Sequence, residues 1–521
     1  TLAETYLDIN KIIEIAKQTG ADAIHPGYGF LAENSDFAQA CSQNYIRFIG
    51  PEANAIKIMG NKIEAARFVQ SLGIPLLNTH TGTLNELEKL KDDLDFPVMI
   101  KAAAGGGGKG MRIVKEPQQL KSALESTSRE AKTYFGNGDV YIEKYIENPK
   151  HIEVQVLGDT HGNIIHLNER ECSVQRRHQK IIEEAPSPTL NENTRREMGE
   201  AAVKIAKAIH YTGAGTVEFL VDENQGFYFL EMNTRIQVEH PVTELITNID
   251  IVKEQINIAQ NNLLSFKQND VKINGHAIEA RIYAEDPMKD FLPSPGKIHH
   301  FNIPVSSQLR LDTGIRENDI ITTEFDPLVA KAIIWGNTRN KAISNLVSEL
   351  EKFEITGIQH NLKFLTEILR SDQFTNNLFT TNLIDRNNKK FVNQILARKK
   401  SIDHHLLIAG YIFIHLQNKK QYSEQAWNHI GYWRPYMQWN IQIDKESYQV
   451  EFTRRNNILT IQTENKTYSA QLKWIDNKSF VLENDTTEEK INYINKEGHS
   501  ELSFKGFVFN MEHNKFEQVI E

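Results

Sequence analysis

The sequence is poor in the features that mark secreted, membrane-spanning and nucleic-acid-binding proteins. Its 521 residues include only two cysteines, Cys41 and Cys172, too few for a disulfide framework or a zinc ribbon. No apolar run approaches the roughly 20 residues that cross a bilayer, so we expect no contact with a membrane. The 59 Lys and Arg residues are outnumbered by 68 Asp and Glu, and the net charge of −9 argues against a nucleic-acid partner. Because the chain has so few cysteines, we expect it to work in a reducing compartment.

The pattern of apolar residues predicts a globular chain of several domains. Hydrophobic residues make up 40% of the sequence and charged residues 24%, and a chain of 521 residues corresponds to about three or four domains. Helix and strand patterns alternate in the first part of the chain, which indicates α/β architecture, and strands then dominate to about 240, which indicates α+β. The clearest strands are expected at 96–103, 111–114, 140–144, 152–157, 164–168, 216–221 and 227–232, and the clearest helices at 59–72, 117–134 and 193–209.

The pattern changes twice toward the C-terminus. The polar stretch 385–390 interrupts it and predicts a boundary near 385–405. Beyond about 430, short alternating strands separated by turn residues predict a small antiparallel β-barrel or sandwich. Four of these strands are expected at 438–444, 448–453, 458–462 and 468–474.

A glycine-rich loop at 105–110 lies between two predicted strands. It fits the dinucleotide fingerprint formally, but that fingerprint requires a helix after the loop, and no Gly-Lys-Ser/Thr of a P-loop is present. A strand–loop–strand of this kind predicts a flap whose backbone N–H groups approach phosphate oxygens without Cβ interference. Lys101, on the strand that enters the flap, supplies a positive charge for a nucleotide phosphate. The alternative is a mobile hairpin without a ligand.

Two glutamates are expected to face each other across a hairpin. If the turn is centred between Asn224 and Gln225, Glu218 lies opposite Glu231, in strands of mainly apolar residues. Two buried carboxylates repel, and a divalent cation between them relieves the repulsion. Oxygen ligands suit Mg²⁺ or Mn²⁺ accompanied by nucleotide phosphates. A different register, with one glutamate solvated, is the alternative.

The strand after Glu231 continues with a polar residue at every second position. If the segment stays extended, Glu231, Asn233, Arg235, Gln237 and Glu239 share one face. That face offers a metal carboxylate, an amide ligand, a guanidinium fork for an anion and a second carboxylate. It predicts a site where a metal-nucleotide meets a small oxyanion, and a solvated edge strand is the alternative.

Several long motifs, in order, closely resemble the biotin carboxylase family of ATP-grasp enzymes. They are HPGYGFL at 25–31, the segment 101–111, QRRHQK at 175–180, EMNTRIQVEHPVTE at 231–244, RIYAEDP at 281–287 and FLPSPG at 291–296. The resemblance covers about residues 1–390 and implies an ATP-grasp fold with a partial Rossmann-like N-terminal domain. Residues 400–521 look most like the linking domain of methylcrotonyl- or propionyl-CoA carboxylase alpha subunits.

This resemblance implies four parts of the chain. They are a partial N-terminal domain at 1–58, an ATP-grasp domain at 59–260 with its flap subdomain at about 76–146, a C-terminal biotin carboxylase domain at 261–390, and a linking β domain at 400–521 that contacts the carboxyltransferase.

The family's functional roles fall on matching positions. ATP would be held by Lys62, Lys101, Gly106, Gly107, Gly108, Met111, Glu143, Lys144, Ile146, His151, Gln175 and His178. Magnesium or manganese would be bound by Glu218, Glu231 and Asn233. Bicarbonate would be held by Lys180, Arg235, Gln237 and the backbone of Val238, with Glu239 as its general base and Arg281 stabilising the enolate of biotin. The catalytic set is thus Lys180, Arg235, Glu239 and Arg281.

Three departures from the family pattern are visible. The family's N-terminal domain begins earlier, with a glycine-containing strand–helix unit, so we expect that the true beginning is missing. Asn61 precedes Lys62 where the family usually has Asp. No Met-Lys-Met biotinylation motif occurs, so biotin is expected on a carrier domain outside this chain.

The implied function is the first half-reaction of an acyl-CoA carboxylase, most like the methylcrotonyl-CoA type. ATP would activate bicarbonate as carboxyphosphate, which carboxylates biotin, while the flap excludes water. Implied partners are the biotin carboxyl carrier domain, a carboxyltransferase beta subunit and a second copy of the chain, in a bacterial cytoplasm or a mitochondrial matrix. The alternatives are another ATP-grasp ligase that activates a carboxylate, and a catalytically idle subunit that docks a carboxyltransferase.

Overall fold

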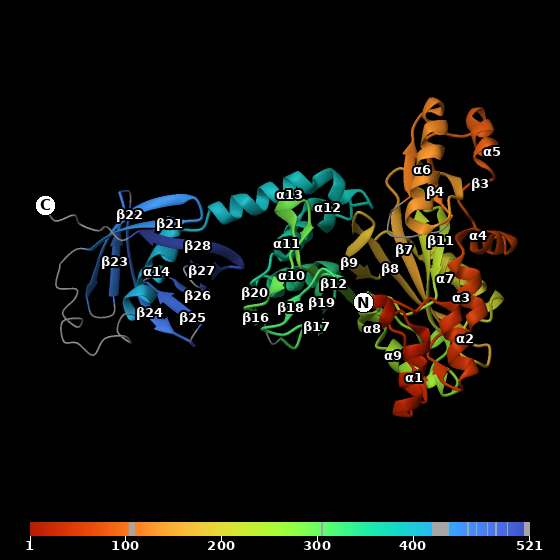
Figure 1. The fold of residues 1–521 in the computed structure, drawn as a ribbon, viewed down its shortest axis with the longest axis horizontal. Coiled ribbons are helices and arrows are strands. Elements are labelled where there is room, and N and C mark those ends of the chain that lie inside the picture. The colour runs from red at the N-terminus through yellow and green to blue at the C-terminus, as the bar shows by residue number, and fades with distance from the viewer. Residues whose placement is uncertain are drawn as a thin grey trace.

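The computed structural model describes residues 1–103, 110–303, 306–418, 437–455, 458–464, 466–476, 478–484, 487–496 and 499–514. The molecule is elongated, with the N-terminal elements at one end, a β-rich C-terminal unit at the other, and a mixed α/β region between them (Figure 1). Of the expected positions, Gly106, Gly107 and Gly108 of the glycine loop lie outside the described residues.

The N-terminal segment is a small α/β unit. Helix α1 (Ile9–Thr19) begins at Asp8, whose carboxylate accepts a hydrogen bond from the Lys11 amide, and ends at Gly20 with φ of 68°. Helix α2 (Ser35–Gln43) follows, and strands β1 (Ala23–Ile24) and β2 (Arg47–Phe48) pair in parallel. This is the α/β alternation that the sequence predicts.

The helix expected at 59–72 is two helices, α3 (Ala53–Gly60) and α4 (Lys62–Ser71). The break falls at Asn61, whose backbone is extended and whose side-chain oxygen accepts hydrogen bonds from the Ile63 and Glu64 amides. A side chain that caps a new helix competes with continuation of the old one. Asn61 therefore starts the helix that carries Lys62.

The flap subdomain is a four-stranded sheet in the order β3-β6-β4-β5. Its strands are β3 (Thr79–Thr81), β4 (Val98–Ala102), β5 (Met111–Val114) and β6 (Val140–Lys144), and its helices are α5 (Leu84–Lys89) and α6 (Leu120–Phe135). Leu120 and Leu124 of α6 pack against Ile100 and Ile142 of the sheet. The antiparallel β4–β5 pair is the strand–loop–strand expected from the sequence.

An eight-stranded sheet forms the centre of the molecule, in the order β11-β10-β7-β8-β9-β12-β19-β17. Its strands are β7 (Lys150–Gly158), β8 (Ile164–Arg176), β9 (Gln179–Ala185), β10 (Gly213–Val221), β11 (Phe227–Asn233), β12 (His276–Tyr283), β17 (Leu309–Thr313) and β19 (Leu328–Gly336). Helices α7 (Glu192–Ala208), α8 (His240–Thr247), α9 (Ile251–Ala259) and α10 (Arg339–Leu350) surround it. Strand β8 extends well beyond the strand expected at 164–168. The sequence did not show the extension, because the buried polar residues of β8 do not resemble the apolar core of a strand.

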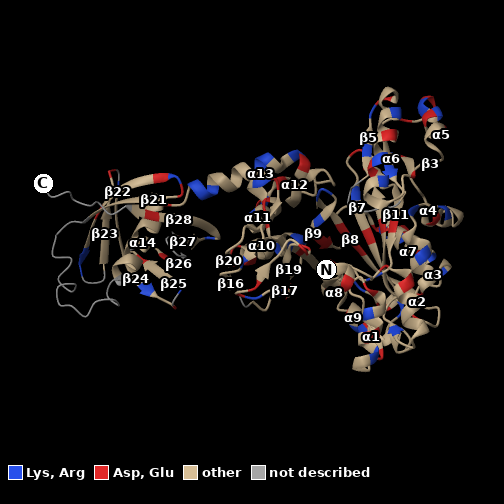
Figure 2. Ribbon diagram, viewed as in Figure 1, with Lys and Arg blue, Asp and Glu red and all other residues tan. Residues whose placement is uncertain are grey.

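The two faces of this sheet differ in chemistry. On β7, Ile152 and Val154 pack with Met198 and Ile205 of α7, while Glu153, which alternates with them, points to the opposite face. Acidic residues recur along the strands of the central sheet (Figure 2). This polar but buried face is where the site is built.

A compact C-terminal part of the same body follows the large sheet. It contains short strands β13 (Glu285–Asp286), β14 (Leu292–Pro293), β15 (Gly296–Lys297), β16 (His300–Asn302), β18 (Ile320–Ile321) and β20 (Glu354–Thr356), and helices α11 (Leu362–Arg370), α12 (Asp372–Thr375) and α13 (Leu383–Lys400). Short 3₁₀ turns occur at Leu2–Glu4, Leu90–Asp92, Pro117–Gln119, Gln268–Asp270 and Pro287–Lys289. The polar stretch 385–390 does not interrupt the structure as expected, because it lies inside α13, whose buried face carries Ile384 and Phe391.

The C-terminal unit is a closed antiparallel barrel of eight strands around helix α14 (His404–Asn418). The strands are β21 (Met437–Ile443), β22 (Glu446–Arg455), β23 (Ile458–Gln462), β24 (Thr467–Trp474), β25 (Ser479–Glu483), β26 (Glu488–Lys496), β27 (His499–Phe504) and β28 (Phe507–Asn514). Leu407, Ile412 and Phe413 of α14 are buried in one core with Phe480 and Leu502 of the barrel. The expected barrel is confirmed, and the helix that fills it was not anticipated.

Helix α13 leads from the central body to the barrel (Figure 1). No helix within the described ranges has both the length and the apolar character needed to cross a membrane.

Candidate active site

A cavity of about 790 Å³ lies between the flap sheet and the polar face of the central sheet. All of the expected site residues that the structure describes line it: Lys62, Lys101, Met111, Glu143, Lys144, Ile146, His151, Gln175, His178, Lys180, Glu218, Glu231, Asn233, Arg235, Gln237, Val238, Glu239 and Arg281. A second cavity, of about 840 Å³, lies beside α2, α3 and α9 and contains none of them. The fold thus brings residues more than 200 positions apart in the sequence, such as Lys62 and Arg281, to the same cavity.

Glu218 and Glu231 are direct cross-strand partners on β10 and β11, as the sequence predicts. The register shifts by one residue between Glu218 and Phe219, so that Val221 pairs with Phe227 near the turn and Leu230 has no partner. Without this bulge Glu218 would face Leu230. Cross-strand partners point to the same side of a sheet, so both carboxylates face the cavity.

The carboxylates and amide at this point fit a hard divalent cation. Glu218 is buried and Glu231 is half-buried, and the Glu218 carboxylate accepts a hydrogen bond of 2.9 Å from the Asn233 amide nitrogen. Two carboxylates and an amide oxygen are donors that Mg²⁺ and Mn²⁺ accept. Burial would raise the pKa of Glu218, but Lys180 and His151 hold it well below its usual value, so the side chain is an anion. The donor set therefore suits a cation of this kind.

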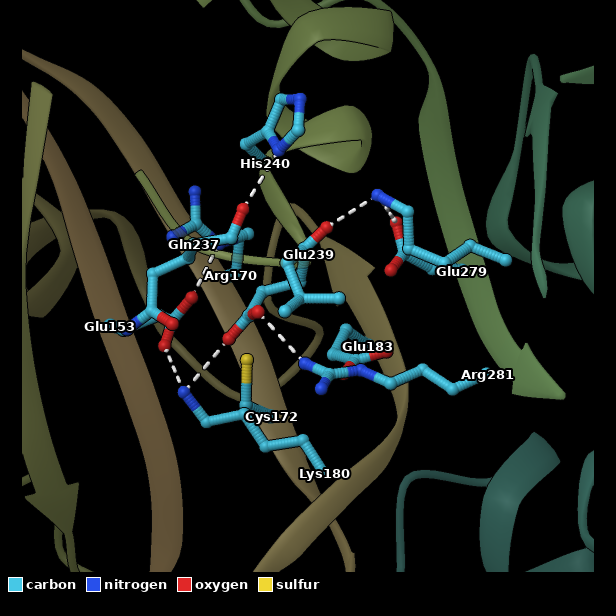
Figure 3. A network of polar contacts seen from close by, with 12 residues as sticks. Glu153, Arg170, Cys172, Lys180, Glu183, Gln237, Glu239, His240, Glu279 and Arg281 are labelled. Carbon is cyan, nitrogen blue, oxygen red and sulfur yellow. Dashed lines mark hydrogen bonds and ion pairs between the residues drawn. The ribbon is translucent and has the colours of Figure 1, made fainter. Parts of the chain in front are cut away.

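Lys180 is the centre of the charge network. Its ammonium lies 2.6 Å from Glu153, 2.7 Å from Glu218 and 2.8 Å from Glu239. Figure 3 shows Lys180 and Arg281 pointing toward the Glu239 carboxylate from different strands. Although burial opposes it, these carboxylates raise the pKa of Lys180 well above its usual value. The ammonium stays charged and gathers three carboxylates around one point.

Glu239 is wholly buried and is held between two cations. Arg281 donates to its second oxygen at 2.8 Å, and the guanidinium of Arg281 also pairs with Glu183 at 2.5 Å. Burial would raise the pKa of Glu239, but Lys180, Arg281 and Arg170 keep it well below its usual value. The carboxylate is therefore ionised and fixed in position, as a general base must be before it accepts a proton.

The segment 231–239 is not extended throughout, so the expectation of one continuous strand face is wrong. Strand β11 ends at Asn233, and the backbone then bends, with Arg235 donating to the Ile236 carbonyl and to the Gln237 side chain. No neighbouring strand pairs with this segment within the described residues, so nothing holds it flat. The five side chains nonetheless reach the same cavity.

Glu33, from the N-terminal unit, positions Arg235. One carboxylate oxygen accepts from the Arg235 Nε at 2.9 Å, and the other accepts from the Thr234 amide at 3.0 Å. The guanidinium is thus oriented by a residue about 200 positions earlier in the chain. Sequence reasoning gave no signal for this contact.

One side of the cavity is formed by the flap sheet and the β8–β9 hairpin. Lys101 on β4 pairs with Glu143 on β6 at 2.5 Å, and both side chains are nearly buried. Arg177 and His178 form a two-residue turn with positive φ values of 48° and 65°, which directs His178 into the cavity. Burial lowers the pKa of His178, so the imidazole is neutral. His151 bonds Gln175 at 2.9 Å and Glu218 at 2.9 Å, which ties this side to the cation position.

Several buried charged residues of the network were missed from the sequence. Glu153 and Arg170 are fully buried and pair at 2.5 Å, and Arg170 also donates to Gln155, Thr216 and Thr243. Glu183, Glu279 and Lys331 lie behind Arg281. Glu153, Glu279 and Lys331 each occupy the polar position of an alternating strand, which is also the pattern of a solvent-facing side chain, and Arg170 lies in a run of polar residues.

Three family models match the chain. They are the biotin carboxylase N-terminal domain over residues 1–56, the carbamoyl-phosphate synthase L chain ATP-binding domain over 61–267, and the biotin carboxylase C-terminal domain over 279–386.

Curated relatives match over most of the chain. Biotin carboxylase 2 of Bacillus subtilis is 49% identical over 386 residues, which are 74% of this chain and 87% of that protein. The mitochondrial methylcrotonoyl-CoA carboxylase subunit alpha of Mus musculus is 41% identical over 493 residues, 93% of this chain and 68% of that subunit. The corresponding subunit of Dictyostelium discoideum is 43% identical over 469 residues. The chain spans 66% of that subunit and 53% of the one from Oryza sativa.

Solved structures have the same fold. The biotin carboxylase domain dimer of Hydrogenobacter thermophilus 2-oxoglutarate carboxylase, in complex with MgADP and bicarbonate, matches with a TM-score of 0.72 and 44% identity, covering 74% of this chain and 86% of that one. Biotin carboxylase from Campylobacter jejuni, in a nucleotide complex, matches with a TM-score of 0.72, 45% identity and the same coverage. The ATP-grasp fold expected from the sequence is thus confirmed.

Proposed function

The chain belongs to the biotin carboxylase family and is an ATP-dependent ligase of that type, and on this premise we propose how its residues carry out the reaction. The observation that carries the proposal is the meeting of Lys180, Glu239 and Arg281 beside Glu218 in one cavity. A cation cluster around an ionised base is suited to a small anion that must lose a proton and attack a phosphoryl group. Bicarbonate has these properties.

We propose that bicarbonate is held by Lys180, Arg235, Gln237 and the backbone of Val238, and that Glu239 takes its proton. In the free chain Glu239 is a weak base, because Lys180 and Arg281 both stabilise its anion. When bicarbonate enters, Lys180 can turn its hydrogen bond from Glu239 to the new anion. Glu239 then gains proton affinity at the step that needs it. The deprotonated bicarbonate attacks the γ-phosphorus of ATP and yields carboxyphosphate and ADP.

ATP would lie along the flap side of the cavity. Lys62 and Lys101 would supply positive charge, and Met111 lies on the flap sheet. Glu143, Lys144 and Ile146 form the wall at the end of β6, and His151, Gln175 and His178 close the opposite side. Gly106, Gly107 and Gly108, which lie outside the described residues, complete the proposed ATP-binding set. Glu218, Glu231 and Asn233 would hold Mg²⁺ or Mn²⁺, which neutralises phosphate charge when bound. Lys62 now pairs with Glu231 at 3.2 Å, so it would be released toward phosphate when Glu231 takes the cation.

The acceptor substrate is biotin on a carrier domain, whose enolate Arg281 would stabilise. The guanidinium is nearly buried and lies at the cavity wall beside Tyr283. A desolvated cation stabilises developing negative charge more strongly than one in water. Carboxyphosphate then transfers its carboxyl group to the ureido nitrogen, and phosphate leaves with the nitrogen's proton.

For the complete enzyme we propose an acyl-CoA carboxylase of the methylcrotonyl-CoA type. Two relatives of that type, from Dictyostelium discoideum and Mus musculus, align along 88% and 93% of this chain and so reach into the barrel, whereas the Bacillus biotin carboxylase and other subunits of that type align along 73–74%. Its partners would be the carrier domain, a carboxyltransferase subunit docked on the barrel, and a second copy of the chain, by analogy with the dimer reported for the Hydrogenobacter domain. The compartment would be a bacterial cytoplasm or a mitochondrial matrix, where the relatives occur.

One assay tests the proposal against its two rivals. ADP release by the purified protein is measured with MgATP, bicarbonate and free biotin, each omitted in turn. We expect release that requires bicarbonate and rises with biotin, and a loss of about 100- to 10,000-fold in Glu239→Gln. Glu349→Gln is the matched control. It replaces a buried acid of α10 that pairs with Lys352 at 2.9 Å, and its rate of ADP release should stay near that of the unmodified protein. Turnover that needs another carboxylate would identify a different ligase, and absence of turnover would indicate an idle subunit.

A further inference from the structure

Two buried glutamates face each other behind Arg281. Glu183 on β9 and Glu279 on β12 are cross-strand partners, and neither is exposed at all. Glu183 pairs with the Nε of Arg281 at 2.5 Å. Both oxygens of Glu279 lack a hydrogen-bond partner among the residues that the structure describes. Two ionised carboxylates in such a place would repel strongly.

The cation on the other side of Glu279 is Lys331, which is nearly buried on β19. Its ammonium donates to the Val238 carbonyl at 2.6 Å and lies 3.2 Å from Asp312, but 3.9 Å from Glu279. The lysine is therefore engaged with the turn that carries Val238 and Glu239 rather than with the buried acid beside it. Lys331 and Arg281 are themselves cross-strand partners, so both project from the same face of the sheet.

Charged groups face Glu279 from each neighbouring element. They are Glu183 on β9, Arg281 on β12, Lys331 on β19 and Glu239 before α8, with Asp312 of β17 acting through Lys331. His240 of α8 is neutral, because burial lowers its pKa to about 3. Burial raises the pKa of Glu279 well above its usual value, Glu183 and Glu239 add to the rise, and Lys331 and Arg281 oppose it incompletely. Burial also raises the pKa of Glu183 to about 7, against the attraction of Arg281.

We propose that Lys331 is a positioning residue for the turn at Val238 and Glu239, and that Glu279 keeps it there by remaining protonated. The inference rests on the proposed function, in which Val238 and Glu239 meet bicarbonate. An ionised Glu279 would attract the ammonium and compete with the Val238 carbonyl for it. A neutral Glu279 leaves Lys331 on the carbonyl and leaves Arg281 paired with Glu183 and Glu239.

The positioning role is tested by steady-state kinetics of Lys331→Met. Loss of a charged hydrogen bond to the Val238 carbonyl should raise the KM for bicarbonate by about 10- to 100-fold. The KM for ATP should stay within about twofold, because the contacts of Lys331 within the described part of the chain are with Val238, Asp312 and Glu279 and not with residues that would hold the nucleotide. Lys352→Met, which removes a lysine from the Glu349 pair outside the site, is the control and should change neither constant. Equal increases in both KM values for Lys331→Met would overturn the positioning role.

The protonation state is tested by thermal unfolding of a double variant. If Glu279 is protonated, adding Glu279→Gln to Lys331→Met changes little, and the Tm of the two variants should agree within about 2 °C. If Glu279 is ionised, Lys331→Met leaves a buried unpaired charge, and Glu279→Gln should then raise the Tm by about 6–20 °C. That rescue would overturn the proposal.

An infrared measurement on the unmodified protein needs no unfolding comparison. A buried protonated carboxylic acid has a C=O stretch distinct from that of a carboxylate, and we expect such a band at neutral pH that disappears in Glu279→Gln. A spectrum that is the same for both proteins would contradict the proposal. Because the band does not depend on turnover, it separates failure of this inference from failure of the proposed function.

Discussion

Replacing Lys180 with methionine should destabilise the protein in a manner that depends on pH. Methionine keeps much of the side chain's length and removes the ammonium that lies within 2.8 Å of Glu153, Glu218 and Glu239. Glu153 retains Arg170 and Glu239 retains Arg281, while Glu218 retains His151 and two amide hydrogen bonds but neither a lysine nor an arginine. One buried negative charge is therefore left without a compensating cation.

The size of the effect follows from that charge count. Removing one partner of a buried ion pair costs about 3–5 kcal/mol. For a cooperative unit of about 150–250 residues, each kcal/mol lowers the Tm by about 2–4 °C, so the expected decrease is about 6–20 °C. Lys352→Met removes a half-exposed lysine from its pair with Glu349, and should cost less than about 1 kcal/mol.

The two proteins should differ in how their stability depends on pH. In the unmodified chain the pKa values of Glu218 and Glu239 lie below their usual 4.5, so their stabilisation is present above that pH and is lost only as pH falls through the lower folded values. The pKa of Lys180 lies above its usual 10.5, so its contribution is present below that pH and is lost as pH rises through the folded value. These groups therefore contribute a constant amount between about pH 5 and 8.

In Lys180→Met, Glu218 loses its cation, and burial then raises its folded pKa above the unfolded value. The folded state binds more protons than the unfolded state, so stability falls as pH rises. Thermal unfolding from pH 5 to 8 should show a Tm deficit that is smallest at pH 5 and largest at pH 8. A deficit that is independent of pH, or largest at pH 5, would refute the charge network as described.

Three further predictions concern other parts of the chain. Glu33→Gln removes the carboxylate that orients Arg235 and should raise the KM for bicarbonate about threefold to tenfold in steady-state assays; an effect on the KM for ATP alone would contradict the assigned contact. Glu218→Gln should weaken Mn²⁺ binding at least tenfold when the free ion is titrated by electron paramagnetic resonance, and unchanged binding would remove Glu218 from the ligand set. Gly357→Ala should lower the Tm more than Gly20→Ala. A Cβ at Gly357 would lie 2.1 Å from the Lys297 carbonyl oxygen at a φ of 100°, whereas a Cβ at Gly20 would meet open space. Equal decreases in Tm would show that the backbone around Gly357 relaxes.

The expected pairing of Glu218 with Glu231 was correct, but the turn is centred on Asn224 and not between Asn224 and Gln225 as expected, and one determinant of the pairing was invisible in the sequence. Asp222 accepts hydrogen bonds from the Asn224 and Gly226 amides and fixes the turn, which is the kind of local chemistry that a sequence reveals. The pairs next to the turn are centred on Asn224, and only the bulge at Leu230 brings Glu231 opposite Glu218. A bulge depends on packing across the sheet, so the sequence does not show it.

The buried charges were missed for a related physical reason. Glu153 and Glu279 alternate with apolar residues along their strands, as solvated side chains also do, and Glu183 is followed directly by Glu184. Only the tertiary structure shows that the second face of this sheet is covered and that cations from distant segments neutralise it. The polar stretch 385–390 led to the opposite error. It predicted a break in the structure, but it lies within α13, whose few buried apolar residues are spaced among charged ones.

Oxygen-isotope transfer tests the central claim most directly. The purified protein is given MgATP, biotin and bicarbonate labelled with oxygen-18, and the inorganic phosphate formed is analysed by mass spectrometry. If Glu239 takes the proton of bicarbonate and the resulting anion attacks the γ-phosphorus beside Lys180, one labelled oxygen passes from bicarbonate into phosphate at each turnover. Phosphate whose new oxygen comes only from water would contradict this account.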